Sequence, residues 1–304
     1  MQILKQKIEH YLIELTWSLW TELGVLGISR HHHDCLIAPE ELILLTTLIA
    51  ELDPRLRDEA LDWCSQYHHF ISVTRLKALI KVCGPCMHLP FSIFAATLNT
   101  ASTANWPLFT KTSIKTFIPS RKSKAPQCKL PALLYLRLRG LFGTGARADL
   151  LTFFLTSKES NFTAADTAQL GYNKRSLSDL LESFVQSGLF DVLSIRNQLF
   201  YRFTKKNEMI QLLGKIPKTT PSWRLILEII LPLWYCIQSI ENKSIATKIT
   251  QIRGVLLEID EQLKLLQLEA PPFQADFNAY LHSFSNWLLS LLENIAHGDF
   301  SKKI

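Results

Sequence analysis

The chain has 304 residues, of which 47% are hydrophobic and 20% are charged. A chain this long and this apolar can bury roughly two or three cores, so it is neither an intrinsically disordered protein nor a small disulfide-dependent one. The net charge of +6 is concentrated in residues 111–220, which hold 18 Lys and Arg against 7 Asp and Glu, while both flanking segments are slightly acidic. Such a basic block is typical of a module that binds a polyanion, although a solvated basic surface would give the same balance.

No segment has the pattern of a secretion signal or a membrane anchor. The N-terminus is amphipathic and lacks a short apolar core followed by small residues. The most apolar run, residues 225–237, contains Glu228 and Pro232 and is shorter than the roughly 20 residues that span a bilayer. We therefore expect a cytoplasmic protein with no membrane partner, reduced cysteines, and a buried helix over residues 225–237.

Residues 1–97 have the pattern of an all-helical domain. Apolar residues recur at helical spacing, and Pro39 and Pro54 each stand where a helix begins. The acidic pair Glu40 and Glu41 is expected to match the dipole of the helix that starts at Pro39. If the protein responds to a small-molecule or protein effector, we expect that effector to bind this domain.

The boundaries between domains are marked by changes in composition. Between residues 98 and 130 the hydrophobic pattern weakens and Ser, Thr, Pro and Lys accumulate, which predicts a basic linker. Two prolines bracket polar residues near residue 219 and mark a second boundary. The expected parts are a helical domain (1–97), a basic linker (98–130), a middle unit (131–216) and a C-terminal helical unit (222–298).

The middle unit carries the most informative pattern in the sequence. The expected elements are a helix over residues 146–155, a short helix over 163–170, a turn at 171–173, a longer helix over 174–187 and a hairpin with strands at 191–195 and 199–203. Thr163 and Asn173 are residue types that cap helix N-termini, and Gly171 is the type that ends a helix.

This order of elements resembles the core of winged helix-turn-helix regulators. The residues that carry the resemblance are LGYNKRSLS at 170–178 and FVQSGLF at 184–190. The regulators are bacterial repressors of the arsenic-resistance and multiple-antibiotic-resistance types, and the similarity covers only residues 131–215. It implies that the helix beginning at Lys174 enters the major groove of double-stranded DNA, and that Arg196 at the hairpin tip reaches the minor groove or the backbone.

The residue types in this unit are consistent with contact to DNA. A helix in the major groove needs donors at its exposed N-terminal positions, because base edges and phosphates are mostly acceptors there. We expect Lys174 or Arg175 to pair with a guanine edge, and Lys205 and Lys206 to extend phosphate contacts along the hairpin. The candidate DNA-binding residues are Thr163, Asn173, Lys174, Arg175, Ser176, Ser178, Arg196 and Arg202.

The C-terminal unit has the clearest helical periodicity. Its apolar seam follows alternating spacings of four and three and consists of Ile245, Ile249, Ile252, Leu256, Ile259, Leu263 and Leu266. A second amphipathic helix, with Phe273 on its apolar side, is expected after Pro272. The seam must face another helix, and the sequence supports an intrachain hairpin and a dimerisation surface equally. Because palindromic DNA favours a paired protein, we expect a homodimer.

Two groups of Cys and His residues resemble a redox motif and a metal site, but their sequence context favours neither role. Residues 83–86 read Cys-Gly-Pro-Cys, the thioredoxin-type motif, but a helical pattern leads into them where that chemistry needs a strand. A helix-ending turn is the expected structure. The ligand types in residues 31–35 and 83–88 lack the spacing of a zinc site, so a polar loop is expected at 31–35.

The sequence therefore predicts a mainly α protein with a central winged helix-turn-helix and a small β-hairpin. It lacks the glycine, serine and histidine motifs of common enzyme families, and we expect no enzymatic activity and no cofactor. The function that it predicts is that of a DNA-binding transcriptional repressor. The alternative is a protein-interaction module, of an antitoxin-like or assembly type, on the same fold.

Overall fold

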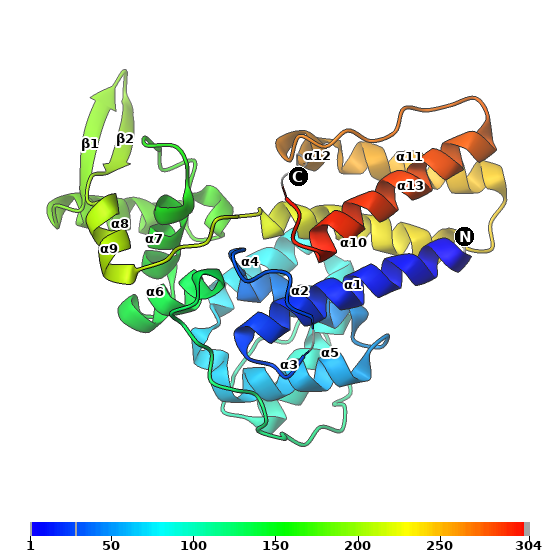
Figure 1. Cartoon of the computed structure of the whole chain (residues 1–304), viewed down its shortest axis with the longest axis horizontal. Coiled ribbons are helices and arrows are strands. Elements are labelled where there is room, and N and C mark those ends of the chain that lie inside the picture. The colour runs from blue at the N-terminus through cyan, green and yellow to red at the C-terminus, as the bar shows by residue number, and fades with distance from the viewer. Residues whose placement is uncertain (1, 28, 301–304) are drawn as a thin grey trace.

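The computed structural model describes residues 2–27 and 29–300, and it confirms the mainly α fold class. Within these residues there are 13 α-helices and one two-stranded antiparallel sheet. Figure 1 shows the middle unit at one end of the molecule, and the N-terminal and C-terminal helices beside each other.

The N-terminal helices surround a central apolar helix. They are α1 (Gln2–Leu23), α2 (Pro39–Ile49), α3 (Pro54–Tyr67), α4 (Val73–Cys83) and α5 (His88–Ala101). α2 contacts the other four, and nearly all of its residues are buried. Asp53 and Ser72 cap α3 and α4, accepting from the backbone N–H of Leu56 and Arg75. These caps explain why both helices begin where they do.

The stretch expected to be a linker is attached to the surface of the N-terminal helices. Residues 102–130, all of which are described, contain no helix or strand, and α5 extends to Ala101, past the predicted boundary at residue 97. The Asp62 carboxylate accepts from the backbone N–H of Arg121 at 2.6 Å and of Ser123 at 3.3 Å. These bonds attach the stretch to α3, so it is not a free linker at this point.

The middle unit has the elements in the predicted order, with one unpredicted helix before them and one after them. They are α6 (Leu134–Phe142), α7 (Ala146–Thr156), α8 (Lys174–Gln186), β1 (Phe190–Ile195), β2 (Gln198–Phe203) and α9 (Lys206–Leu213). A bridge pairs Phe162 with Tyr201, and its N–H···O distances are 3.0 and 2.7 Å. α9 was not predicted, and it takes Lys206 off the hairpin to which the sequence assigned it.

The segment between α7 and α8 differs from its prediction. Residues 163–170 form turns that end in a short 3₁₀ helix, η4 (Ala168–Leu170), where the sequence predicted an α-helix. Gly171 then takes φ +77°, and a Cβ built on it would lie 2.9 Å from the Ala78 Cβ. Glycine is therefore required at this turn both for its conformation and for its close approach to α4.

Most of the C-terminal seam is buried inside the chain, whereas Ile245 at its start is 44% exposed. The helices are α10 (Trp223–Ile240), α11 (Ile245–Glu258), α12 (Asp260–Leu265) and α13 (Phe277–Ala296). Ile249, Ile252 and Leu263 are at most 4% exposed, because α11 packs against α10 and α13 and α12 packs against α10. The sequence left open whether this seam packs within the chain or forms a dimer. In the structure it packs against helices of the same chain. Phe273 lies outside α13 and is half exposed.

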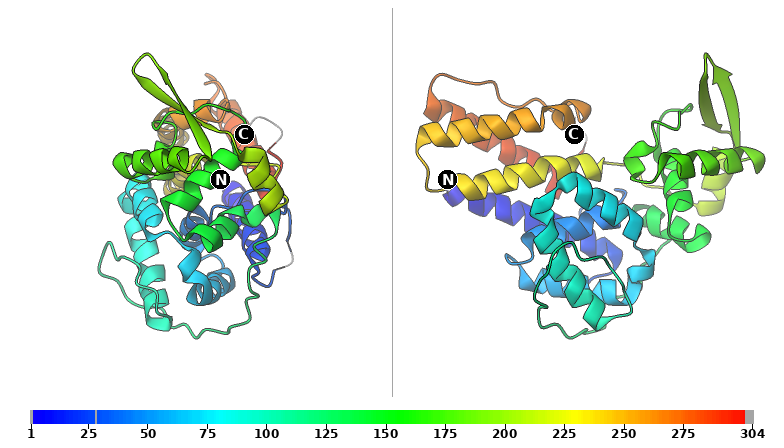
Figure 2. Two further views of the ribbon diagram at one scale, coloured as in Figure 1. Left: turned by 90° about the vertical axis from the view of Figure 1, so that its left-hand side faces the viewer. Right: turned by 180° about the vertical axis from the view of Figure 1, so that it is seen from behind.

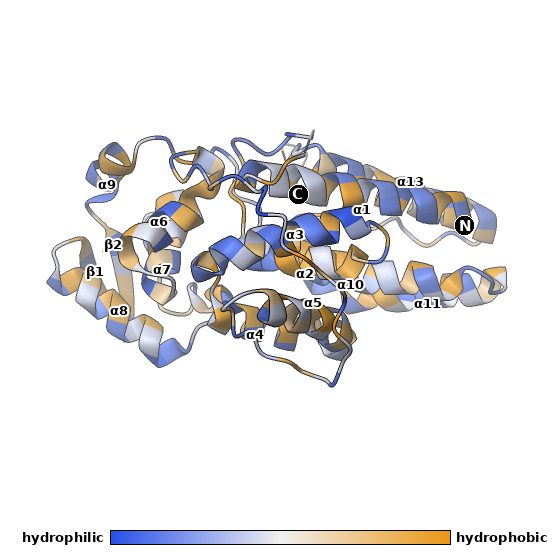
Figure 3. Ribbon diagram, turned by 90° about the horizontal axis from the view of Figure 1, so that it is seen from below, coloured by the Kyte–Doolittle hydropathy of each residue, from blue (hydrophilic) through white to orange (hydrophobic). Residues whose placement is uncertain are grey.

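Contacts between distant helices join the two ends of the chain. α1 packs along α13, and α10 contacts α2 and α4, as the view from behind in Figure 2 also shows. The hydropathy colouring in Figure 3 shows α10 as a mostly apolar helix, and α2 is one of the helices that it contacts. Among the described helices, α10 is the one long and apolar enough to cross a membrane by length and composition, but 61% of it is buried within the chain. It is longer than the apolar run that marks it in the sequence.

Candidate functional site

The first turn of α8 presents the predicted polar side chains to solvent. Asn173 caps the helix, its side-chain oxygen accepting from the Arg175 backbone N–H at 2.8 Å. Lys174, Arg175 and Ser176 are exposed, whereas Leu177 faces the core. The apolar spacing of α8 therefore predicted correctly which side of the helix is buried.

The basic part of α8 is confined to that first turn. Ser178 is half-buried, so its hydroxyl is less available than its position on a helical wheel indicated. Asp179 and Glu182 are exposed on the following turns and place negative charge there. An anion such as a phosphate can therefore approach the N-terminal end of α8 but is repelled by its middle.

Thr163 is less suited to contact phosphate than predicted. Its backbone N–H and its hydroxyl both donate to Asp166 Oδ2, at 2.7 and 2.9 Å, and the first of these bonds is one half of the capping box that the sequence indicated. The hydroxyl proton is used in this contact. A carboxylate directly beside it would also repel a phosphate.

The hairpin is more apolar than its predicted role required. Arg196 and Asn197 form the tip with φ of 47° and 63°, the left-handed pair of a tight two-residue turn. Arg202 is exposed but lies 3.7 Å from Asp191, the residue opposite it in the register. The strands also expose four apolar side chains, with exposed fractions of 39–53%: Val192, Leu193, Ile195 and Leu199.

Two further cations lie on α4, beside the turn that leads into α8. Lys77 and Lys81 are exposed and flank Ala78, the residue that approaches Gly171. The sequence placed α4 in a separate domain, so its lysines were not linked to the middle unit. Their four-residue spacing puts both on one face of α4, but only the tertiary packing brings that face next to the turn.

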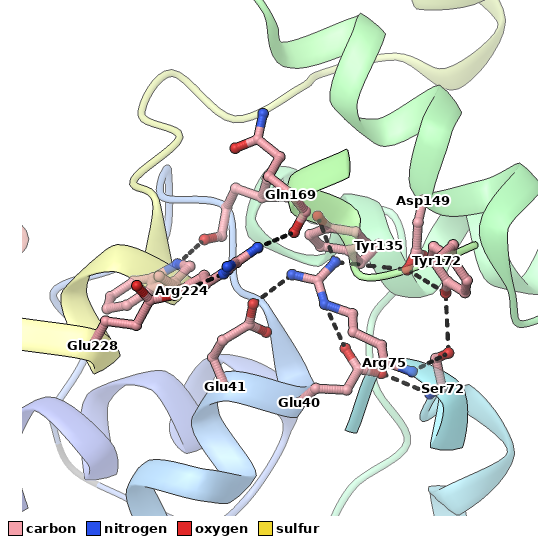
Figure 4. A network of polar contacts seen from close by, with 12 residues as sticks. Glu40, Glu41, Ser72, Arg75, Tyr135, Asp149, Gln169, Tyr172, Arg224 and Glu228 are labelled. Carbon is pink, nitrogen blue, oxygen red and sulfur yellow. Dashed lines mark hydrogen bonds and ion pairs between the residues drawn. The ribbon is translucent and has the colours of Figure 1, made fainter. Parts of the chain in front are cut away.

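A buried polar network holds the turn and α7 against the N-terminal helices (Figure 4). The Tyr172 hydroxyl donates to Asp149 Oδ2 at 2.8 Å and lies 3.0 Å from the Ser72 hydroxyl. Arg139 of α6 donates to Asp149 at 2.9 Å and to Glu40 at 2.7 Å. The network therefore fixes the orientation of α8 relative to α2 and α4.

The charges of this network are coupled by their burial. Burial raises the pKa of the Glu40 carboxyl, against the opposing effect of Arg139 and Arg75. Burial also acts to raise the pKa of Asp149, but the same two guanidinium groups outweigh it and hold that pKa below its usual range. Glu40 lies in the first turn of α2, where it was expected to match the helix dipole, and it is fully buried. Charged residues within apolar helices, such as Arg139 and Asp149, were the signal available in the sequence.

The Cys-Gly-Pro-Cys motif is a turn between two helices, as predicted. Cys83 ends α4, and the Gly84 N–H donates to the Ile80 carbonyl with Gly84 at φ +81°. Burial raises the pKa of the Cys83 thiol to about 12, so little thiolate exists at neutral pH. A helix C-terminus also lacks the positive dipole end that activates a thiol.

The histidine-rich segment is the loop between α1 and α2 that the sequence predicted, with His31 and His33 exposed, but it also carries one buried histidine. His32 is fully buried, accepting from the Ser18 hydroxyl at 2.7 Å and donating to the Ile295 carbonyl at 2.9 Å. Its pKa falls to about 4, chiefly because burial disfavours the charged ring. In the part of the chain that the structure describes, no group of three or more His, Cys, Asp or Glu is arranged to hold a metal ion.

No family model matches this chain, and no curated protein or solved structure matches it either.

Proposed function

We propose that the chain is a sequence-specific DNA-binding regulator of transcription, acting in the cytoplasm as a repressor. The first turn of α8 is the observation that supports this function most. Residues 174–177 contain two cations and no Asp or Glu, at the end of the helix where the dipole is positive. Each such cation is unfavourable by about 0.3–1 kcal/mol in the free protein, and a bound phosphate would reverse that effect.

The order of elements around this turn also supports DNA binding. A helix, a bridge at Phe162, a helical turn, a second helix and a hairpin follow one another, as in winged helix-turn-helix proteins. In this role Lys174 or Arg175 reads a base edge in the major groove. Ser176 and the free amide nitrogen of Asn173 contact phosphates, and Arg196 contacts the backbone or the minor groove.

α4 adds a contact that the middle unit alone would lack. Lys77 and Lys81 lie beside the turn before α8 and extend its positive charge toward the N-terminal helices. Such contacts would neutralise phosphates flanking the site that α8 reads, and they carry no sequence information themselves.

The test is selection of bound fragments from genomic DNA, followed by affinity measurements on the selected site. The variant K174A/R175A is expected to bind at least tenfold more weakly, because two charged donors are lost. The slope of log affinity against log salt should also fall by about 1 for each phosphate contact removed. The control K7A/K264A removes two exposed lysines from α1 and α12 and should bind as the parent does.

Two results would contradict this proposal at different levels. Failure to retain any DNA in low salt would overturn the DNA-binding function. Equal affinity of K174A/R175A and the parent for the selected site would overturn the role of α8 while leaving DNA binding in place.

A protein-interaction role is the second candidate, because the hairpin exposes four apolar side chains. An exposed apolar hairpin is a common contact surface. With the seam of α11 and α12 buried, a homodimer would need another surface, and this hairpin is available. Light scattering of the parent and of L193K/L199K tests whether the hairpin is a dimer contact. A dimer formed through the hairpin should be present in the parent and dissociate in the variant.

A further inference from the structure

A cavity of about 230 Å³ lies where the N-terminal, middle and C-terminal units meet. Its lining is drawn from all of them, with Leu36, Glu41, Arg75, Gln169, Trp223 and Arg224 among the residues. Sites for drug-sized ligands have volumes of about 300–1,000 Å³, so this one suits a smaller molecule. The polar side chains around it face one another in Figure 4.

Glu41, one of the lining residues, has an unused acceptor. Glu41 is only 3% exposed, and its Oε1 accepts from Arg75 Nη2 at 2.5 Å. Its other oxygen, Oε2, is buried and has no hydrogen-bond partner among the described residues. A buried acceptor without a donor is unfavourable and rare in folded proteins.

The charge around Glu41 makes a cation the preferred donor. Arg75 and Arg139 lie among three buried carboxylates, those of Glu40, Glu41 and Asp149. This cluster therefore carries one negative charge in excess when all its members are ionised. An ammonium group bound to Glu41 Oε2 would balance that charge and satisfy the oxygen at once.

Arg224, another lining residue of the cavity, offers donors. Arg224 at the start of α10 donates through Nε to Glu228 at 2.7 Å and through Nη1 to the Gln169 carbonyl at 3.4 Å. A guanidinium has five N–H groups, and its remaining donors suit a carboxylate. Leu36 and Trp223 are among the apolar residues that line the cavity.

We infer that this cavity binds a free α-amino acid, with its ammonium group on Glu41 and its carboxylate on Arg224. The apolar lining would receive the side chain of the ligand. The site lies between the parts of the chain, and not within residues 1–97 where the sequence led us to expect an effector.

Binding there would act on α8, a step that rests on the proposed DNA-binding function. Gln169 and Leu170 line the cavity and belong to η4, which leads through Gly171 and Tyr172 into α8. A ligand that joins Glu41 of α2 to Arg224 of α10 beside η4 would favour one placement of the turn. The amino acid would then be the effector that adjusts the affinity for DNA.

The direct test is calorimetric titration of the full chain with each standard amino acid in turn. At least one is expected to bind with a stoichiometry of one. Two analogues of that amino acid, one lacking the ammonium group and one lacking the carboxylate, should each bind at least tenfold more weakly. The variants E41Q and R224M are expected to reduce affinity at least tenfold, whereas the controls E59Q and R253M should not.

A variant that fills the cavity without removing a charge separates loss of binding from misfolding. Ser222 lines the cavity and its side chain makes no capping bond to α10, so S222M should fill the space and abolish binding without unfolding the chain. Absence of binding by any amino acid would overturn the site. Binding that R224M and S222M leave unchanged would overturn it as well.

The regulatory step is tested separately, on the DNA fragment selected with the parent protein. The bound amino acid is expected to change affinity for that fragment at least fivefold in the parent and not in S222M. Titration without any effect on DNA affinity would contradict the effector role alone. A protein that binds no DNA would contradict the proposed function and leave the titration result standing.

Discussion

Arg139 illustrates how burial determines what a charged residue does in this chain. Its guanidinium is fully buried, with Nε 2.9 Å from Asp149 and Nη1 2.7 Å from Glu40. It also donates to the Phe70 carbonyl at 2.8 Å. Because α6, α7, α2 and the segment before α4 meet at this one side chain, its loss would affect contacts between units and not only within one.

Replacing Arg139 with Met is therefore expected to destabilise the protein by about 3–5 kcal/mol, since Glu40 and Asp149 would be left buried without a full complement of cations. Urea unfolding of the full chain measures this. R147M, at an exposed position of the same region, is the matched control and should change stability by less than about 0.5 kcal/mol. If R139M lost less than about 0.5 kcal/mol of stability, as the control is expected to, the network would contribute little to the stability of the protein.

At the scale of elements, α8 and the hairpin follow from local sequence, but their attachment does not. The spacing of Leu177, Leu181 and Phe184 predicts the buried side of α8, and all three are buried. The link between the turn and α4 depends on Tyr172 and Ser72, which lie 100 residues apart in the chain. Nothing local to either residue indicates that they meet.

Tyr172→Phe tests this attachment. The change removes the hydroxyl that donates to Asp149 and contacts Ser72, and it is expected to lower stability by about 1–3 kcal/mol. Hydrogen exchange should also become faster over residues 168–178, because η4 and the start of α8 lose their tie to α4. Y235F, whose hydroxyl donates to a carbonyl outside the middle unit, serves as control. Unchanged exchange over 168–178 in Y172F would contradict the attachment.

At the scale of the whole molecule, His32 joins the two ends of the chain. Its ring lies between Ser18 of α1 and the Ile295 carbonyl of α13. Burial lowers its pKa from 6.5 to about 4 in the folded protein, so the unfolded chain binds a proton on this ring at a higher pH than the folded chain does. Its contribution to stability is therefore full above pH 6.5 and is lost as the pH falls toward 4.

This difference predicts a loss of about 3 kcal/mol of stability between pH 6.5 and 4 from His32. Urea unfolding across that range measures the slope, and H32Q should flatten it in addition to any loss of stability at neutral pH. H282Q, at an exposed position of α13, should leave the slope as it is in the parent. An equal slope in the parent and in H32Q would disprove the assignment.

The sequence by itself determined the helical class, the capped starts of α3 and α8, the buried side of α8, and the hairpin with its tip at Arg196. These features depend on periodicity and on residues close together in the chain, where each side chain's conformational preference acts directly. The intrachain partner of the α11 seam, by contrast, was decided only by tertiary packing.

The polar contacts between units were also decided by tertiary structure. Glu40 has the position of a dipole partner and is a buried member of an ion network, and His32 stands in a polar string and is part of the core. The docking of α4, which carries Lys77 and Lys81, brings Ala78 close to Gly171 in the turn before α8. The environment of these residues depends on which surfaces of the protein pack together. Burial makes an unpaired charge unfavourable, so a buried charged residue needs a partner, and that partner can lie far away in the sequence.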